Sequence, residues 1–407
     1  MTTLPALNSL RPLAATLLGL AGLATGSVSA ETSPYYLGAS QRFTHNSNVF
    51  LAQDAVAKSD TISSTGVRVG IVQPISRQRL SASLSANANR YSSLSALNNT
   101  DYALDTRLDW ETVDRLSGNV ALSSRESLPS DAAALSSGLR NLLKVNSASV
   151  QANLGGVTMW SFDAGAAVSR ASYSEAVYAR NNTRQSSINA GARVTPASGL
   201  TLRTGLRHAN ISYPNANNDV RRNDLDFSAT VSPGGASVFN GRVSLTRERH
   251  SFADRNVSNW TGALGWNWNP TGKLSTSLNL SRDSSNGSYD FTTGTINVGS
   301  SNSTVATTLG LTTQWEVTSK IAMTGNLSHS RRSLDNSLTV GTGVAPSSAS
   351  DSTNSLGLSV QYAVLRNVDL GCGVTWSDRS VSSAGVTVLS APYSATTYSC
   401  FGQALLR

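Results

Sequence analysis

The sequence predicts an all-β protein, an antiparallel up-and-down transmembrane β-barrel of about 18 strands. Three observations predict this fold: an N-terminal export signal, apolar and polar residues that alternate along the rest of the chain, and short turns that alternate with long polar connections. Only 39% of the residues are hydrophobic and 14% are charged. This mixture is too polar for membrane-spanning helices and too weakly charged for ordinary disorder.

Residues 1–30 have the parts of a secretory signal peptide. A basic residue precedes the apolar run at 12–23, and small residues at 28–30 form a cleavage site before Glu31. The alternative is an N-terminal anchor, but the apolar run is shorter than the ~20 residues that a spanning helix needs. We therefore expect a signal peptide at 1–30 and a mature barrel at 31–407, in the outer membrane of a Gram-negative bacterium.

Strict alternation is the period-2 pattern of strands with one face in each of two environments. The clearest example is the pair of segments 260–269 and 274–281, in which the even positions carry the tryptophans, the leucines and glycine. The residues between them, Pro270 to Lys273, have the composition of a tight turn. We expect hairpins of this kind to repeat along the whole mature chain.

Tight turns and long connections alternate along the sequence. Tight turns are predicted near Ser76, Asp114, Gly156, Ala197, Gly234, Thr271, Thr318 and Arg366. Longer polar connections are predicted at 46–58, 92–100, 129–144, 171–184, 212–222, 251–256, 285–303, 334–353 and 381–394. Outer-membrane barrels combine short periplasmic turns with longer external loops, and bacterial barrels have even strand counts, so about 18 strands follow.

Tryptophans mark the expected membrane boundaries, because interfacial aromatic residues form girdles on the lipid-facing side of such barrels. One group lies near the proposed turns: Trp110, Trp160, Trp266, Trp268 and Trp315. Trp260 and Trp376 lie toward the opposite ends of their strands. The alternative is a soluble β-rich protein, such as an adhesin or β-solenoid, but large aromatics would then more often lie mid-strand in a core.

If the apolar parity faces lipid, the other parity faces the lumen, and that parity is rich in arginine. The candidate residues of the substrate path are Arg68, Arg107, Arg125, Arg193, Arg203, Arg207 and Arg242. Acids share the same parity: Asp105, Asp109, Glu111, Asp163, Asp226, Glu248 and Asp369. Guanidinium groups could attract anionic substrates. Alternatively, they pair with these acids and stiffen the wall.

Cysteine and histidine usage limits the chemistry. Cys372 and Cys400 have lipid-facing parity near the C-terminus, in a compartment that permits disulfides, so we expect a bond between them, with two free thiols as the alternative. The four histidines have no metal-ligand spacing. The common hydrolase and metalloprotease motifs are missing. We therefore predict no enzyme activity, no metal, no cofactor and no nucleic-acid partner.

The chain resembles the EpsL-type barrels of exopolysaccharide operons, within the group called putative β-barrel porin 2. The resemblance is carried by the signal peptide, the opening segment 36–43 (YLGASQRF), the segment 45–50 (HNSNVF), the repeated hairpins and the late cysteine pair. It covers the whole mature chain. The sequence departs from many barrels by ending in Leu405, Leu406 and Arg407 rather than in phenylalanine.

The resemblance implies an outer-membrane channel for exopolysaccharide export, without catalysis by the barrel. Its arginine-bearing lumen would favour an acidic glycan. The implied partners are outer-membrane lipid, the polysaccharide and a periplasmic polysaccharide co-polymerase or export component. The residues alone predict only an outer-membrane channel, so two other functions stay open: a general anion-preferring diffusion porin, and a structural or adhesive surface barrel.

Overall fold

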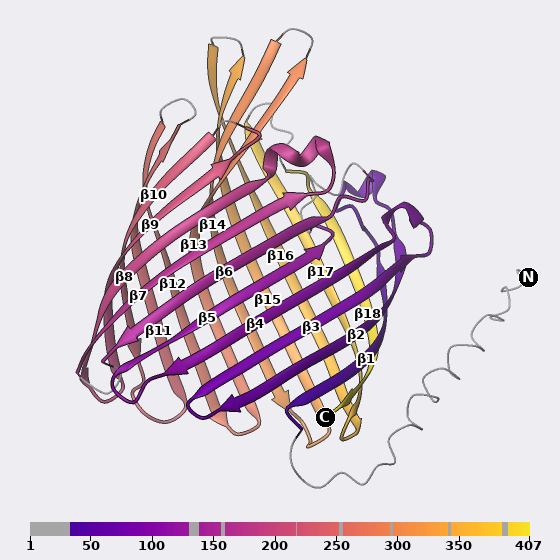
Figure 1. Ribbon diagram of the computed structural model, residues 1–407. Coiled ribbons are helices and arrows are strands. Elements are labelled where there is room, and N and C mark those ends of the chain that lie inside the picture. The colour runs from indigo at the N-terminus through magenta and orange to yellow at the C-terminus, as the bar shows by residue number, and fades with distance from the viewer. Residues whose placement is uncertain are drawn as a thin grey trace, which may run out of the picture.

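The computed structural model describes most of the expected mature chain. The described residues are 33–129, 138–155, 159–216, 218–251, 255–293, 296–340, 343–384 and 390–407. The predicted signal peptide at 1–30 lies outside them. Within these residues the protein is one closed sheet of 18 antiparallel strands (Figure 1), which confirms the predicted fold class and strand number.

The strands are between 12 residues (β1) and 23 residues (β16) long, more than the ~9–11 residues that a tilted transmembrane strand needs. In chain order they are β1 (Tyr35–Asn46), β2 (Asp60–Ile75), β3 (Gln78–Tyr91), β4 (Asn99–Glu111), β5 (Leu116–Ser127), β6 (Leu143–Leu154), β7 (Trp160–Tyr173), β8 (Thr183–Ala197), β9 (Leu200–Tyr213), β10 (Asn218–Val231), β11 (Ser237–His250), β12 (Arg255–Thr271), β13 (Leu274–Thr293), β14 (Ile296–Glu316), β15 (Ile321–Val340), β16 (Gly343–Leu365), β17 (Val368–Ala384) and β18 (Tyr393–Leu406).

Each strand pairs with its neighbours in sequence, and β1 closes the barrel by pairing with β18. Closure leaves no free sheet edge, so the backbone hydrogen-bonding groups of every strand can be satisfied within the protein. That requirement is absolute in hydrocarbon, where no water is present to accept or donate hydrogen bonds. The topology is therefore one that can cross a bilayer.

The two ends of the barrel differ, as the turn pattern predicts. At one end the strands are joined by tight turns, and the start of β1 and the end of β18 lie at this end (Figure 1). Ser76 and Gly199 make two of these turns with positive φ angles of 56° and 80°. The turn predicted near Gly156 falls at 156–158, outside the described residues. We call this the turn end, and the opposite one the loop end.

At the loop end, short 3-10 helices interrupt three of the connections: η2 (Asp54–Val56), η3 (Ser95–Leu97) and η4 (Ala176–Asn181). Two predicted loops are wrong. Residues 285–303 and 334–353 mostly extend β13–β14 and β15–β16 as hairpins that project beyond the barrel (Figure 1). Their Ser, Asn and Gly content is typical of loops, but cross-strand pairs such as Ser288 with Ser301 satisfy the backbone within each hairpin.

The two faces of the sheet have opposite chemistry. Along β12, the outward-facing Leu264 lies between Gly241 of β11 and Leu280 of β13, and its side chain is 59% exposed. Ile188 and Leu206 are similarly exposed on β8 and β9. An outward apolar band this continuous is unfavourable in water and favourable against lipid tails. No helix among the described residues is long and apolar enough to cross a membrane.

Tryptophans cluster near the turn end on the outward face. Phe239 stacks on Trp266 with a ring-centroid distance of 6.1 Å, and Trp266 lies 5.8 Å from Trp268. Trp160 and Trp315 are about half exposed at the same ends of β7 and β14. This arrangement matches the aromatic girdle of a membrane interface.

Candidate channel lining

The register of the sheet shows which side chains face inward. Arg68, for example, stands between Val67 and Val69, which are 56% and 42% exposed on the outer face. The same alternation puts all seven candidate arginines on the inner parity: Arg68, Arg107, Arg125, Arg193, Arg203, Arg207 and Arg242. They come from β2, β4, β5, β8, β9 and β11 and do not form one cluster.

Five of the seven candidate arginines lie in ion pairs with acids. Their Nε or Nη atoms lie between 2.5 and 3.7 Å from carboxylate oxygens. The pairs are Arg107 with Asp109, Arg125 with Asp105, Arg203 with Asp163, Arg207 with Asp224, and Arg242 with Asp283. Much of the positive charge of the inner wall is therefore balanced within the wall itself.

The pair Arg203–Asp163 crosses a whole strand. Arg203 is on β9 and Asp163 is on β7, and the Nε and Nη2 atoms of Arg203 donate to the two carboxylate oxygens at 2.8 and 2.5 Å. The guanidinium passes over Gly191 of the intervening β8, where a Cβ atom would lie 2.6 Å from Nη2. A side chain at position 191 would push the guanidinium out of this bidentate geometry, and its Cβ atom would also lie 2.9 Å from the carbonyl oxygen of Thr204.

Asp224 on β10 is the centre of the most buried charge network. Its carboxylate accepts from Arg207 Nε at 2.8 Å, from Arg222 Nε at 2.9 Å and from Thr246 Oγ1 at 2.6 Å. Arg222 also reaches Glu248 at 3.3 Å. The side chains of Asp224 and Glu248 are fully buried. A buried carboxylate is stable only with such partners.

The connection that contains η4 lies over this network. η4 leaves the barrel between β7 and β8 but contacts β13, five strands away from β8 (Figure 1). Asn215 in the β9–β10 turn donates to the carbonyl oxygen of Ala179 at 2.8 Å. Inward-facing Val220, Glu248 and His250, at the loop end of β10 and β11, are at most 1% exposed. η4 therefore covers part of the inner wall at the loop end.

The loop-end part of β13 also covers the inner wall. β12 and β13 pair only from Gly262 and Arg282 toward the turn end. Beyond Arg282, β13 leans over the inner face, so that Asp283 lies 3.7 Å from Arg242 and Ser284 donates to Glu248 at 3.4 Å. The inner wall of β9–β13 is thus narrowed at the loop end by polar contacts.

A second charged cluster lies on β15 and β16, five and six strands from β10. Arg332 on β15 donates to both carboxylate oxygens of Asp351 on β16, at 2.8 and 2.6 Å, and Ser390 Oγ donates to the same carboxylate at 2.6 Å. Arg379 lies 4.8 Å from the ring centroid of Tyr393. Neither Arg332 nor Arg222 is among the candidate residues from the sequence, although both have the inward parity.

Arg68 and Arg193 differ from the paired arginines. Both are exposed on the inner face, and no described acid lies within ion-pair distance of either. Arg193 stands directly opposite Arg203 in the register of β8 and β9. These two guanidinium groups are available to solutes in the channel.

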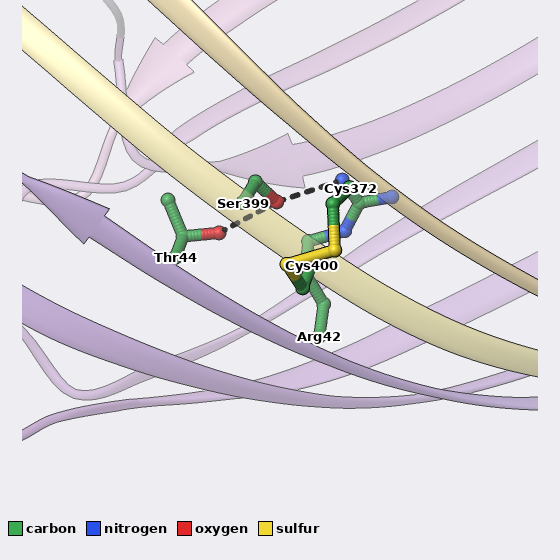
Figure 2. The surroundings of a disulfide bond; sticks show 5 residues. All are labelled: Arg42, Thr44, Cys372, Ser399 and Cys400. Carbon is green, nitrogen blue, oxygen red and sulfur yellow. Dashed lines mark hydrogen bonds between the residues drawn. A yellow bond between two sulfur atoms is a disulfide. The ribbon is translucent and has the colours of Figure 1, made fainter. Parts of the chain in front are cut away.

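A disulfide joins Cys372 of β17 to Cys400 of β18 on the outward face (Figure 2). The two residues are directly opposite in the register, with a Cα–Cα distance of 4.1 Å. On the inner face beside it, Arg42 and Thr44 of β1 both hydrogen-bond Ser399, at 3.3 and 3.2 Å. The disulfide therefore locks the C-terminal hairpin β17–β18, and side-chain hydrogen bonds join β18 to β1 where the barrel closes.

The described residues contain no group of three or more His, Cys, Asp or Glu side chains that could hold a metal ion. The inner wall offers carboxylates, guanidinium groups, hydroxyls and amides, each already placed on a rigid strand. Such a wall can orient and discriminate passing solutes by charge and hydrogen bonding.

Comparisons with known proteins find similar folds. No family model and no curated protein matches the sequence. OpdK of Pseudomonas aeruginosa, solved with vanillate, aligns with a TM-score of 0.48 and 10% identity over 91% of this chain and 99% of that chain. The siderophore receptor PirA of the same species aligns at 0.42 and 12% identity, covering 93% and 81%. The FrpB iron transporter of Neisseria meningitidis (F3-3 variant) aligns at 0.44 and 10%, covering 92% and 82%.

The class of protein follows from the chain's own structure. A closed antiparallel barrel with an apolar outer band, aromatic residues at its rim and a polar inner face is an outer-membrane barrel of Gram-negative bacteria. Barrels of 16–18 strands leave an aqueous channel inside. The protein is an outer-membrane β-barrel channel.

Proposed function

We propose that the protein is a passive diffusion channel for small hydrophilic solutes, with a preference for anions. The observation that carries this proposal is the pair of exposed inner-face arginines, Arg68 and Arg193, which have no acid partner among the described residues. Fixed guanidinium groups in a water-filled channel attract anions and pair with carboxylates or phosphates. The paired arginines contribute much less, because nearby carboxylates cancel their charge.

Planar bilayer recording tests this function. The purified protein should give stepwise conductance, and a salt gradient should give a reversal potential of the sign expected for anion selectivity. The variant Arg68→Gln with Arg193→Gln should move the reversal potential toward zero. A protein that inserts and remains closed, or that is cation-selective, would contradict the proposal.

Export of an exopolysaccharide is the second candidate, and the observation that favours it is the inner wall of β14–β16. Inward-facing hydroxyl and amide groups follow one another there: Thr312 Oγ1 hydrogen-bonds Asn326 at 3.1 Å, and Thr308 Oγ1 lies 3.0 Å from Ser330 Oγ. Such a row could exchange hydrogen bonds with a hydroxylated polymer. In this hypothesis the barrel is non-catalytic and works with a periplasmic co-polymerase or export component.

A clean deletion distinguishes the two functions. The export hypothesis predicts loss of secreted glycan on deletion and its return when the gene is supplied again. The diffusion hypothesis predicts normal glycan secretion and slower uptake of small anions. Cells that secrete glycan normally without the protein would rule out export.

A further inference from the structure

Basic side chains cluster on the outer face of the barrel near the loop end. We call them the basic belt. They share the outward parity and the loop-end half of their strands, and they are Arg90, Lys144, Arg170, Arg184, Arg221, Arg247, Arg249, Arg282 and Arg331. Neither the channel nor its charge selectivity explains them, because they face away from the lumen.

The register brings like charges together within the belt. Arg170 of β7 pairs directly with Arg184 of β8, and Arg221 of β10 pairs directly with Arg249 of β11. Like charges directly opposite on one sheet face are destabilising. The pair Arg170–Arg184, which has no described acid within ion-pair distance, indicates that this face carries negative charge from another molecule.

The protein supplies few acids for this charge. Among the described loop-end residues of β7 to β11, Asp219 is the only acid with the outward parity. No described acid lies within ion-pair distance of Arg170, Arg184 or Arg221. On the inner face of the same strands, carboxylates accompany Arg203, Arg207 and Arg222.

The residues of the basic belt lie at a similar distance from the turn end of the barrel. Arg170 stands ten residues from Trp160 on β7, and Arg221 stands ten residues from Val231 on β10. The same spacing separates Ile321 from Arg331. Ten residues of a strand are about 33 Å long. Because the strands are tilted by about 40° from the barrel axis, this length spans about 25 Å along the axis, which equals the height of the apolar band. The belt therefore lies at the level of the outer-leaflet headgroups.

We propose that the basic belt binds the phosphate groups of the glycolipid in the outer leaflet, the phosphorylated diglucosamine of lipopolysaccharide. Guanidinium groups bind phosphate in bidentate fashion, and a row of them fits a headgroup with two phosphates. Arg282 lies 4.8 Å from the ring centroid of Trp260, which supplies an interfacial aromatic at the same level. Acyl chains would lie on the apolar band below.

The basic belt is densest on β7–β11, where five of its nine residues lie. On β16–β18 and β1, the outward loop-end positions hold Asn354, Asp378, Tyr398 and His45 instead of arginine. This side lies away from β7–β10 (Figure 1). The glycolipid should therefore be bound at β7–β11 rather than around the whole circumference.

Binding to the full folded protein in detergent tests the proposal. The probes are diphosphorylated lipid A, its dephosphorylated form and inorganic phosphate. We expect Arg170→Gln with Arg184→Gln, and separately Arg221→Gln with Arg247→Gln, to weaken lipid A binding at least tenfold. The control, Arg77→Gln with Arg115→Gln, removes the same charge at the turn end and should change affinity less than twofold.

The three probes and the variants distinguish the proposal from its alternatives. Equal binding of dephosphorylated lipid A to the unaltered protein would overturn it, and this arm does not depend on any variant folding. Unchanged affinity in both folded belt variants would overturn it as well. Displacement of lipid A by submillimolar inorganic phosphate would show a free-anion site rather than a lipid site.

Discussion

Arg221 and Arg222 are consecutive residues on β10, yet they face opposite environments. Arg222 points inward and contacts Asp224, Glu248 and Thr246, and its side chain is 16% exposed. Arg221 points outward beside Arg249, and no described acid lies within ion-pair distance of Arg221 itself. On this one strand, Arg222 is ion-paired and mostly buried, whereas Arg221 is exposed on the outer face.

This difference shows that arginine content alone does not define what a barrel binds. Inside, acids on the same strand or on nearby strands neutralise the guanidinium groups, and the result is a stiffened wall. Outside, Asp219 is the only acid with the outward parity among the described loop-end residues of β7 to β11, so the charge there is available to a ligand. The positive formal charge of +8 is therefore distributed unevenly between the inner and outer faces. Substitutions on the two faces should have different effects.

The largest effect is expected at the centre of the inner network. Asp224→Asn keeps the shape of the side chain but leaves Arg207 and Arg222 with one carboxylate less. Removing one partner from a buried network costs about 3–5 kcal/mol. Denaturant unfolding of the protein folded into phospholipid vesicles measures this loss.

An exposed pair provides the matched control for that variant. Asp105→Asn removes the partner of Arg125, whose side chain is 63% exposed. Such pairs contribute about 0–1 kcal/mol because water screens them. Equal losses in the two variants would contradict the distinction between buried and open parts of the inner wall.

The neighbours on β10 allow a sharper test of the two faces. Arg222→Gln should reduce the free energy of unfolding by about 3 kcal/mol, because the fully buried carboxylates of Asp224 and Glu248 lose a charged partner. Arg221→Gln should stay within about 0.5 kcal/mol, as surface substitutions do. Lipid A binding should show the reverse order, with a loss only in Arg221→Gln. A loss of lipid A binding in Arg222→Gln alone would refute the assignment of faces.

The glycine beneath Arg203 tests how the inner pairs are made. In Gly191→Val, the new side chain would occupy the path of the guanidinium toward Asp163. Overpacking of this kind costs about 1–3 kcal/mol. The displaced Arg203 should also make the channel more anion-selective, which bilayer recordings can measure. Gly272→Ala, at a position with open space around it, is the control.

Much of the fold could be predicted from the sequence, because a period of two residues in the side-chain pattern is a local property. The inward placement of arginines such as Arg193, the pairing of Cys372 with Cys400 and the outward tryptophans all follow from parity and strand order. The extended hairpins of β13–β16 could not be predicted, because their Ser and Asn residues are typical of loops and their stability comes from mutual backbone pairing.

The charge network could not be predicted in full, because its longest contacts depend on how strands are placed across the sheet. Asp163 reaches Arg203 across a third strand, and this requires both the register and a glycine at position 191. The placement of η4 over the inner wall depends on a contact with β13 that no local pattern encodes. The basic belt, in contrast, could have been found from the sequence, since its residues recur at a fixed distance from apolar residues at the turn end.

The smallest effect is expected from Arg193, the inner-face arginine that most resembles those of the belt. It stands opposite Arg203 and has no described acid partner, so Arg193→Gln should leave stability within about 0.5 kcal/mol. It should also relieve repulsion between the two guanidinium groups, which offsets any lost contact. The measurable change is a reversal potential less favourable to anions, with unchanged lipid A affinity. An unchanged reversal potential would mean that the inner wall is neutral to solutes, and charge for binding would then be confined to the outer face.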